Sequence, residues 1–431
     1  MAATRVRYWV IVFAVSLAVI QYLDRVSISS AAAVPAIRRD LGLSDVQMGW
    51  VFSAFGLAYA IFDIPGGYLG DRLGPRKVLM RVVVWWSFFT AATGWAWNYS
   101  SIVVTRFLFG AGEAGCFPNL TKVFSTWLPP KERVRAQGIL WMSARWGGAF
   151  APLVVTPVIL WVGWRLAFVL FGSVGLIWAV IFYRWFRDNP MDKPKLNQEE
   201  RDLLRVSARN ASGHGDVPWK TILGSGRVWM LCWQYFALSY GWYFYITWLP
   251  TYLREGRHLT ITSTTLLSVL PLFVGGLANP VSVFVSERLT RWTRDIAKTR
   301  RIVACSGFAG ACGCLVLSTA VNNPVLAMLT IAMASFCNDL VMPCAWGATM
   351  DLGGKYAGTV SGTMNSVGNL AGAALPVAIP YILRWANNDW DITFFVSAAM
   401  YATGILSWIF LDSVTPLPQP ADEIPANLTA H

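Results

Sequence analysis

The chain has 431 residues, of which 55% are hydrophobic and 13% are charged, and its mean hydropathy is +0.47. Soluble domains carry about 25% charged residues, so this composition excludes a soluble enzyme, a disordered chain and a disulfide-rich secreted domain. The net charge of +12 would suggest nucleic-acid binding in a soluble chain, but membrane proteins collect Lys and Arg on cytoplasmic loops. We therefore expect a polytopic membrane protein.

Apolar runs of about 20 residues, the length that spans ~30 Å of hydrocarbon as a helix, recur along the whole chain. They predict twelve transmembrane helices, at about 8–33, 46–70, 76–97, 100–127, 135–160, 164–186, 228–253, 263–286, 300–321, 324–350, 357–383 and 391–411. The first run resembles a signal peptide, but Asp24 and Arg25 interrupt its apolar core. We therefore expect an uncleaved first helix.

The distribution of Lys and Arg predicts the orientation of these helices. An even number of spans places both ends of the chain on one side, and cytoplasmic termini leave few cations outside. The outer loops would then hold only Arg38, Arg39, Arg165, Arg254, Arg257 and Arg384. Because cytoplasmic loops carry the excess of cations, both termini are predicted to be cytoplasmic.

The only long connection between predicted helices is polar and runs from Asp188 to Arg227, with an amphipathic stretch near 197–208. About 40 residues are too few for a catalytic domain. This connection divides the chain into an N-terminal six-helix bundle, a cytoplasmic linker, a C-terminal six-helix bundle and a cytoplasmic tail. The predicted boundaries are 1–187, 188–226, 227–412 and 413–431.

The segment from Gly67 to Lys77 reads G-Y-L-G-D-R-L-G-P-R-K and resembles the signature loop of the major facilitator superfamily. Its glycines allow a tight turn, and Asp71 can lie at a helix end facing Arg72 and Arg76. The resemblance implies an all-α fold of two six-helix bundles. It also implies that Asp71, Arg72 and Arg76 form a cytoplasmic latch between helices.

Three further segments resemble the anion:cation symporter family: Gln21 to Arg25, Phe62 to Gly67 and Arg106 to Pro118. That family includes bacterial hexuronate, galactonate and glucarate transporters, sialin and the vesicular glutamate transporters. The resemblance extends over essentially the whole chain and is strongest over residues 20–150.

Charged residues inside the predicted spans require an explanation, because a charge at bilayer depth is costly unless it is paired or hydrated. Arg106 and Glu113 share one face of a helix, Asp24 and Arg25 are adjacent, and Arg145 lies in the fifth span. The planar fork of arginine matches a carboxylate, which favours a cavity that binds an organic anion. The resemblance implies that Arg25 and Arg106 contact the substrate carboxylate or its coupling acid. The alternative is that Asp24–Arg106 or Arg25–Glu113 pairs only hold helices together.

Energy coupling needs a group that changes charge, and no histidine lies in a predicted span. The resemblance implies that Asp24 and Glu113 are the protonation sites. Asp339 is a candidate proton or substrate-hydroxyl site, with a helix-packing hydrogen bond as the alternative. Asp63 is predicted to be a gate partner for a cytoplasmic arginine, with a coupling role as the alternative, and Lys122 is predicted to extend toward the cytoplasmic interface.

Neutral polar and aromatic residues are predicted to complete the binding site. Asn365 and Asn369 share one face of the eleventh span, where the family's asparagines bind substrate hydroxyls; the alternative is helix packing. The other candidates are tyrosines and a tryptophan on predicted spans: Tyr22 and Tyr59 as family-type contacts, Tyr240 and Tyr243 as cavity walls and outer gate, and Trp346.

These features predict proton-coupled symport of an organic anion into a bacterial-type cell through the inner membrane. The resemblance to vesicular glutamate transporters would imply a cation on the seventh span, and this chain has none there. This weakens an amino-acid dicarboxylate substrate and favours one carboxylate surrounded by hydroxyls, as in a hexuronate or an aldonate. We expect a monomer with no cofactor, metal or nucleic acid, whose partners are the substrate, protons and lipid. The alternatives are an exporter, an organic-anion or phosphate exchanger, a sodium-coupled symporter and a transport-inactive nutrient sensor. A membrane enzyme is disfavoured because the spans carry no nucleophile–base pair.

Overall fold

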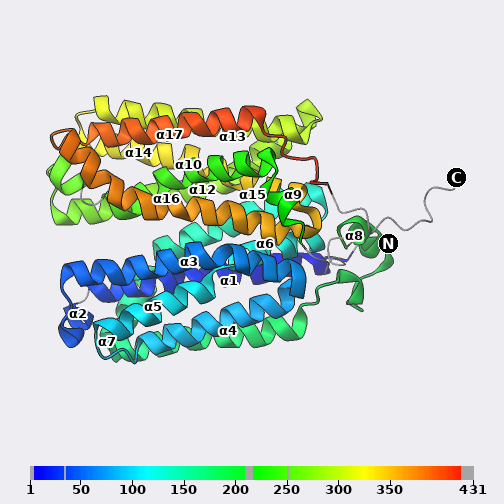
Figure 1. Cartoon of the computed structure of the whole chain (residues 1–431), viewed down its shortest axis with the longest axis horizontal. Coiled ribbons are helices and arrows are strands. Elements are labelled where there is room, and N and C mark those ends of the chain that lie inside the picture. Colours follow the sequence, from blue (N-terminus) through cyan, green and yellow to red (C-terminus); the bar gives the residue numbers. More distant parts are fainter. Residues whose placement is uncertain (1–3, 34, 209–216, 250–251, 419–431) are drawn as a thin grey trace.

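The computed structural model describes residues 4–33, 35–208, 217–249 and 252–418, and every regular element in these ranges is helical. Long helices run side by side over most of the length of the molecule (Figure 1). The all-α class predicted from the apolar runs is confirmed.

The first half of the chain contains the short helix η1 (Val6–Tyr8) and then seven α-helices. These are α1 (Trp9–Ala33), α2 (Pro35–Leu41), α3 (Asp45–Leu73), α4 (Pro75–Thr93), α5 (Tyr99–Glu113), α6 (Cys116–Trp127) and α7 (Pro130–Trp185). The connection that follows holds η2 (Pro190–Asp192), α8 (Gln198–Ala208) and α9 (Trp219–Leu223). The amphipathic stretch predicted near 197–208 therefore forms α8.

The described part of the second half contains seven α-helices and two short helices. They are α10 (Gly226–Thr247), η4 (Tyr252–Gly256), α12 (Ile261–Thr293), α13 (Ile296–Ala320), α14 (Pro324–Asp339), α15 (Met342–Gly353), η5 (Gly354–Tyr356), α16 (Ala357–Trp385) and α17 (Asp391–Phe410).

The helices form two groups, one from each half of the chain, lying against each other (Figure 1). Helix α16 packs against α3, and α7 packs against α12, so these pairs join the groups. This arrangement places α1, α3, α7, α10 and α16 around the middle of the molecule. The domain boundaries predicted above remain predictions.

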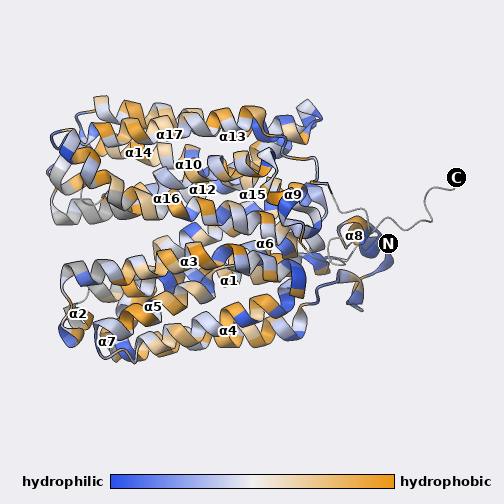
Figure 2. Cartoon of the chain, in the orientation of Figure 1, coloured by the Kyte–Doolittle hydropathy of each residue, from blue (hydrophilic) through white to orange (hydrophobic). Residues whose placement is uncertain are grey.

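Six helical stretches of the described residues are long and apolar enough to cross a membrane: Val6–Arg25, Val154–Trp185, Val269–Thr293, Ile296–Ala320, Pro324–Leu375 and Asp391–Phe410. Apolar residues also follow most of the other long helices (Figure 2). The count of twelve spans remains a prediction.

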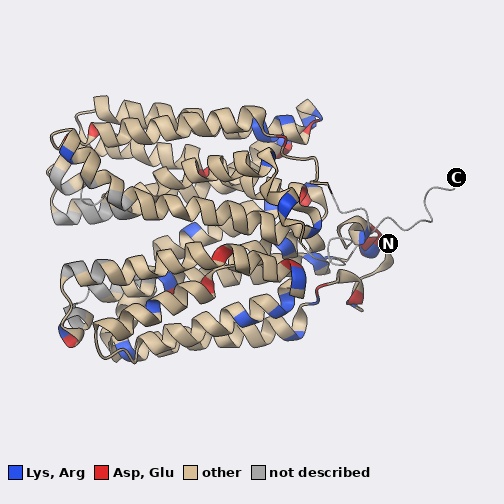
Figure 3. Ribbon diagram, in the orientation of Figure 1, with Lys and Arg blue, Asp and Glu red and all other residues tan. Residues whose placement is uncertain are grey.

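The two ends of the helix groups differ in charge. One end, which we call the α8 end, lies next to α8, and the opposite end carries α2 (Figure 1). Lys and Arg gather at the α8 end (Figure 3). This is the end that the sequence predicts to be cytoplasmic.

Two predicted spans are interrupted in the middle. The span predicted at 100–127 divides into α5 and α6 at Gly115, whose φ of +82° is left-handed, a conformation that glycine adopts without strain. The span predicted at 324–350 divides into α14 and α15 around Leu340 and Val341, with Pro343 near the start of α15. Both interruptions lie near the central cavity and reorient the second part of the helix.

Helix α7 contains both the fifth and the sixth predicted spans. At Gly163 its backbone has φ +78° and ψ +158°, which is not helical, and the chain changes direction there. The predicted boundary between 160 and 164 therefore agrees with the structure.

Candidate functional site

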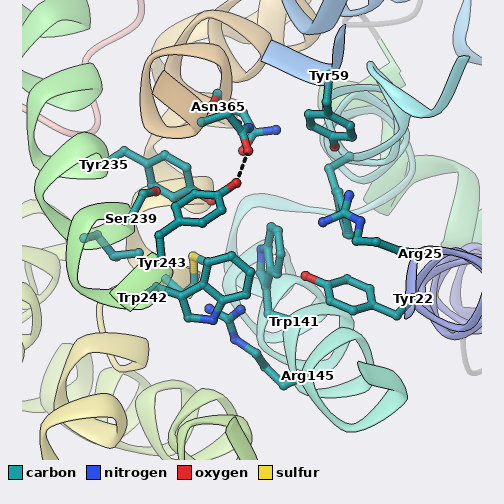
Figure 4. A pocket seen from close by; sticks show the side chains of 14 residues that line it. Tyr22, Arg25, Tyr59, Trp141, Arg145, Tyr235, Ser239, Trp242, Tyr243 and Asn365 are labelled. Atoms are coloured by element: carbon teal, nitrogen blue, oxygen red, sulfur yellow. Dashed lines mark hydrogen bonds between the residues drawn. The ribbon is translucent and has the colours of Figure 1, made fainter. Parts of the chain in front are cut away.

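A small cavity of about 40 Å³ lies between the two groups of helices. Side chains from α1, α3, α6, α7, α10, α15 and α16 line it. Figure 4 shows Arg25 of α1 and Arg145 of α7 directed into this space, opposite Tyr235, Ser239 and Tyr243 of α10. A water-accessible space that carries arginines in the middle of an apolar protein is suited to binding an anion.

Seven residues predicted to bind substrate line this cavity: Tyr22, Arg25, Tyr59, Arg145, Tyr243, Asn365 and Asn369. The helix faces read from the sequence therefore converge on one space. Arg106, Tyr240 and Trp346 were also predicted to bind substrate, but they do not line it. Tyr240 lies about 140° around α10 from Tyr235, which turns it into the protein core.

Trp346 is fully buried in a layer behind the cavity wall. Its indole N–H donates to Tyr235 Oη at 3.1 Å, and its ring packs against Trp141 and Phe117, which stack on each other at 4.5 Å. Trp346 therefore positions the lining residues.

The sequence interpretation missed half of the lining: Phe117, Trp141, Tyr235, Leu238, Ser239, Trp242 and Met342. Spacing carried a signal for some of them. Tyr235 and Ser239 precede Tyr243 by eight and four residues, so the three share a helix face. Trp141 precedes Arg145 by one turn in the same way. Nothing in the local sequence marks Phe117 or Met342.

The carboxylate of Glu113 is the partner of Arg25. Its Oε1 accepts hydrogen bonds from Gln21 Nε2 at 2.7 Å and Arg25 Nε at 3.0 Å, and it forms an ion pair with Arg25 Nη2. Glu113 is fully buried, whereas the Arg25 side chain keeps 22% of its surface exposed. The Arg25–Glu113 pair given above as an alternative is therefore present, and its arginine still faces the cavity.

Asp24 and Arg106 form a second buried group of charges between α1 and α5. Both oxygens of Asp24, and Nε and Nη1 of Arg106, are buried without a hydrogen-bond partner among the described residues. Arg106 lies within electrostatic range of Asp24, and its guanidinium lies 4.0 Å from the centre of the Phe109 ring. Arg106 therefore balances the charges behind the cavity wall.

Arg145 joins the two halves of the chain through Asp339. Its Nε and Nη2 donate to the two carboxylate oxygens of Asp339, each at 2.9 Å, and both side chains are almost fully buried. The indole of Trp242 covers the guanidinium at 4.5 Å. Asp339 thus contacts the cavity residue Arg145 but does not itself line the cavity.

Asp63 lies where α3 crosses the α5–α6 break. It accepts from the Gly115 amide at 2.9 Å and from Asn365 Nδ2 at 2.6 Å. The predicted arginine partner is wrong, because neither hydrogen-bond donor to Asp63 in the described part of the chain is an arginine. Asp63 instead ties the break to α16, and the close approach of Gly66 to Gly115 makes this geometry possible.

Asp71 crosses from α3 to the first turn of α16 at the α8 end. It accepts from the Gly358 amide at 3.2 Å, from the Thr359 amide at 2.5 Å and from Thr359 Oγ1 at 2.7 Å, and it pairs with Lys122 Nζ at 3.2 Å. A carboxylate at a helix N-terminus is favoured by unpaired amides and the helix dipole. Lys122 is buried here, so its predicted extension to the interface is wrong.

The two arginines of the signature loop do not face Asp71 as predicted. Arg72 is exposed and donates to Tyr68 Oη at 2.9 Å. Arg76 donates to the carbonyl of Tyr183 at 2.7 and 3.1 Å, and its amide donates to Asp188. Both contacts stay within the first half of the chain, whereas Asp71 and the backbone of Gly67 contact α16 of the second half.

A second contact between the halves lies at the same end. Asp351 accepts from Arg133 at 2.9 Å and from Arg300 at 2.7 Å. Arg133 also donates to the carbonyls of Ser125 and Leu128. The α8 end of the cavity is therefore closed by ion pairs and helix capping.

A scan against protein-family models matches the Major Facilitator Superfamily over residues 14–376. The chain belongs to this superfamily. Its relatives place it in the anion:cation symporter family. The "Probable sulfoacetate transporter SauU" of Cupriavidus necator is 34% identical over 412 residues, which cover 94% of this chain and 93% of the relative. The hexuronate transporter of Bacillus subtilis is 29% identical over 87% of each chain.

Among solved structures, the proton:xylose symporter XylE bound to 6-bromo-6-deoxy-D-glucose superposes with a TM-score of 0.74 at 14% identity, covering 95% of this chain and 97% of that chain. The likeness shows the shared fold. Together with the family and its relatives, it identifies a multi-pass membrane transporter and not an enzyme. In the described residues, no group of three or more His, Cys, Asp or Glu side chains could hold a metal ion.

Proposed function

We propose that this transporter imports an organic anion together with protons, and that the anion is a sugar acid such as a hexuronate or an aldonate. The observation that carries the proposal is the position of Arg25, whose guanidinium is shared between the buried Glu113 and the cavity. One edge of the cation holds the carboxylate, and the remaining N–H groups can receive an anion.

The residues around Arg25 support a substrate with hydroxyl groups. The cavity presents the hydroxyl of Ser239 and the phenol of Tyr22. Asn365 lies beside them with its amide nitrogen already bound to Asp63, which leaves its carbonyl oxygen as an acceptor. Aromatic rings such as Trp141 form apolar walls. The hydroxyl partners and ring faces around Arg25 suit a carboxylated sugar.

Proton coupling would act through the Arg25–Glu113 pair. Protonation of Glu113 removes its charge and weakens its hold on Arg25, so the guanidinium can bind the substrate carboxylate. Release of the anion then favours return of Arg25 to Glu113 and loss of the proton. Asp24 is the second proposed proton site, because its buried oxygens lack partners beside Arg106.

Alternating access would require the α8 end to open. The contacts of Asp71 and Asp63 with α16, and of Arg133 with Asp351, join the two halves there. If this end is cytoplasmic, as the sequence predicts, these contacts form the inner gate. Substrate would enter from the α2 end and leave after they separate.

The relatives support the class of substrate more than its identity. Sulfoacetate and hexuronates are both small organic anions. The uptake test therefore uses two substrates: a sugar acid, which is the proposed one, and sulfoacetate as a second probe. The inner membrane of a bacterial-type cell and a monomeric state remain part of this proposal.

The test is uptake of radiolabelled D-glucuronate and sulfoacetate into proteoliposomes that contain the purified chain. We expect an inside-alkaline pH gradient to drive uptake of one of them and a protonophore to abolish it. Arg25→Lys should lower uptake about 10-fold or more, because one ammonium cannot serve Glu113 and a substrate carboxylate with a planar fork. Arg227→Lys, in a half-exposed pair with Asp412, is the control and should transport normally.

Other outcomes would contradict parts of the proposal. Uptake that follows a sodium gradient, or that needs a counter-anion inside and ignores pH, would overturn proton symport. Uptake of sulfoacetate without any sugar acid would overturn the substrate class but retain anion transport. A normal rate in Arg25→Lys would remove Arg25 from the binding site.

A further inference from the structure

Two arginines face the same cavity, and each is paired with a buried carboxylate in the same way. Arg25 uses Nε and Nη2 on Glu113, and Arg145 uses Nε and Nη2 on Asp339. In each case one edge of the guanidinium holds a buried carboxylate. Nη1 of both residues has no hydrogen-bonding partner within the described residues, and both residues line the cavity.

Aromatic rings fix both guanidinium groups in place. Rings of Tyr22, Phe55 and Tyr59 lie 5.0–5.1 Å from the guanidinium carbon of Arg25. Trp242 lies 4.5 Å from that of Arg145. Because ring faces and a carboxylate restrain each cation, the edge left for a ligand has a set direction, and little side-chain entropy is lost on binding.

The two cations are near neighbours across the cavity. The phenol of Tyr22 lies within electrostatic range of both guanidinium groups, and Tyr22 stands between them in Figure 4. Because both arginines line the same cavity, a small molecule with an acid group at each end could contact both of them. A monoanion would bind one arginine and leave the remaining N–H groups of the other arginine without an anionic partner.

We propose that the preferred substrate is a short organic dianion, with one acid group bound by Arg25 and the other by Arg145. This inference rests on the proposed function and specifies, among sugar acids, those that carry an acid group at each end. Asp339 has the same role for Arg145 as Glu113 has for Arg25. It binds the guanidinium while the cavity is empty, and the second acid group of the substrate replaces it as the partner of Arg145. The Arg145–Asp339 pair is therefore a specificity determinant as well as a contact between α7 and α14.

The rival explanation is that this pair only joins the two halves. The two explanations differ in what happens when both charges are removed together. A structural tie affects all ligands equally, whereas a second anion position affects only the ligand with a second acid group. Removing both charges also avoids an unpaired buried ion, which by itself destabilises a protein strongly.

The experiment compares the binding of D-glucarate and D-gluconate to the purified full-length chain. Binding is measured as a rise in the thermal midpoint. The two share a six-carbon chain and differ at one end, where glucarate has a carboxylate and gluconate a hydroxymethyl group. In the unmodified protein, glucarate should give the same thermal stabilisation as gluconate at a concentration about 10-fold lower, or lower still. This is expected for an added charge-assisted contact. The double variant Arg145→Gln/Asp339→Asn should still bind gluconate but should lose the preference for glucarate, so that the two compounds stabilise it at similar concentrations.

Two further variants complete the test. Arg227→Gln/Asp412→Asn removes an ion pair at the surface and should keep the preference for glucarate. Arg145→Lys keeps the charge opposite Asp339 but lacks the fork, so it should reduce the preference for glucarate over gluconate. It serves as the second measurement if the double variant fails to fold.

Equal binding of glucarate and gluconate by the unmodified protein would overturn this inference and leave sugar-acid transport intact. So would a double variant that loses both ligands equally. Stabilisation by neither compound would instead contradict the sugar-acid class of the proposed function, and the dianion inference would fail with it.

Discussion

At the scale of single residues, the proposed proton coupling depends on the ion pair between Glu113 and Arg25. Its carboxylate holds two guanidinium nitrogens and is itself fully buried. Glu113→Gln keeps the size of the side chain and removes its charge, so Arg25 is no longer held by an anion. We expect the variant to bind and exchange labelled substrate across proteoliposomes but to lose uptake driven by a pH gradient, by about 10-fold or more.

The comparison of exchange with driven uptake separates coupling from folding. Glu287→Gln changes an exposed carboxylate of α12 outside the cavity and should preserve both activities. If the Glu113→Gln protein still accumulates substrate when a pH gradient drives uptake, proton coupling belongs to another carboxylate. Asp24 would then be the first to test.

At the scale of elements, the break between α5 and α6 depends on Gly115. Its φ is +82°, and a Cβ at this position would lie 2.6 Å from Cα of Gly66. Gly115→Ala therefore adds left-handed strain of about 1–2 kcal/mol to overpacking of about 1–3 kcal/mol. We expect the free energy of unfolding to fall by about 2–5 kcal/mol, measured as a lower thermal midpoint.

Two other glycines separate these contributions. Gly163 has φ +78° with no atom within 4 Å of an added Cβ, so Gly163→Ala should show the strain alone. Gly313 lies inside α13 with free space around it and ordinary φ, and alanine there should stabilise by about 0.5–1 kcal/mol. Any other rank order of the three midpoints would contradict the close approach of Gly66 and Gly115.

At the scale of the whole molecule, Asp71 links the two halves at the α8 end. It caps α16 and pairs with Lys122, so Asp71→Asn should weaken the closed state of this end. Spin labels at Lys77 and Arg294, both exposed, in a background without the seven native cysteines would report the separation. We expect the distance distribution to shift toward longer values, because charge-assisted bonds to a helix N-terminus are lost.

Asp412→Asn provides the control for that measurement. It removes one partner of a half-exposed pair with Arg227, which surface screening makes weak, and the distances should not change. An unchanged distribution in Asp71→Asn would mean that other contacts, such as Arg133 with Asp351, keep the end closed without it.

Much of the arrangement could be predicted because its causes are local in sequence. The family resemblance pointed to Tyr22 and Arg25 of α1, and helix periodicity placed Asn365 and Asn369 of α16 on one face. All four residues line one cavity. The break at Gly115 was missed, since a glycine inside an apolar run does not reveal a left-handed backbone. The partners of Asp63 and Asp71 were also missed, because amides of α6 and α16 are invisible as donors until the helices cross.

The sequence by itself determined that this chain is a helical membrane protein. It also showed which charged residues lie within the predicted spans and which family their sequence segments resemble. Only the tertiary structure decided how the charges pair: Arg25 with Glu113, Arg145 with Asp339, and Asp71 with the start of α16. The physical reason is that burial of apolar surface depends on local composition, whereas an ion pair between segments far apart depends on helix crossing and rotation.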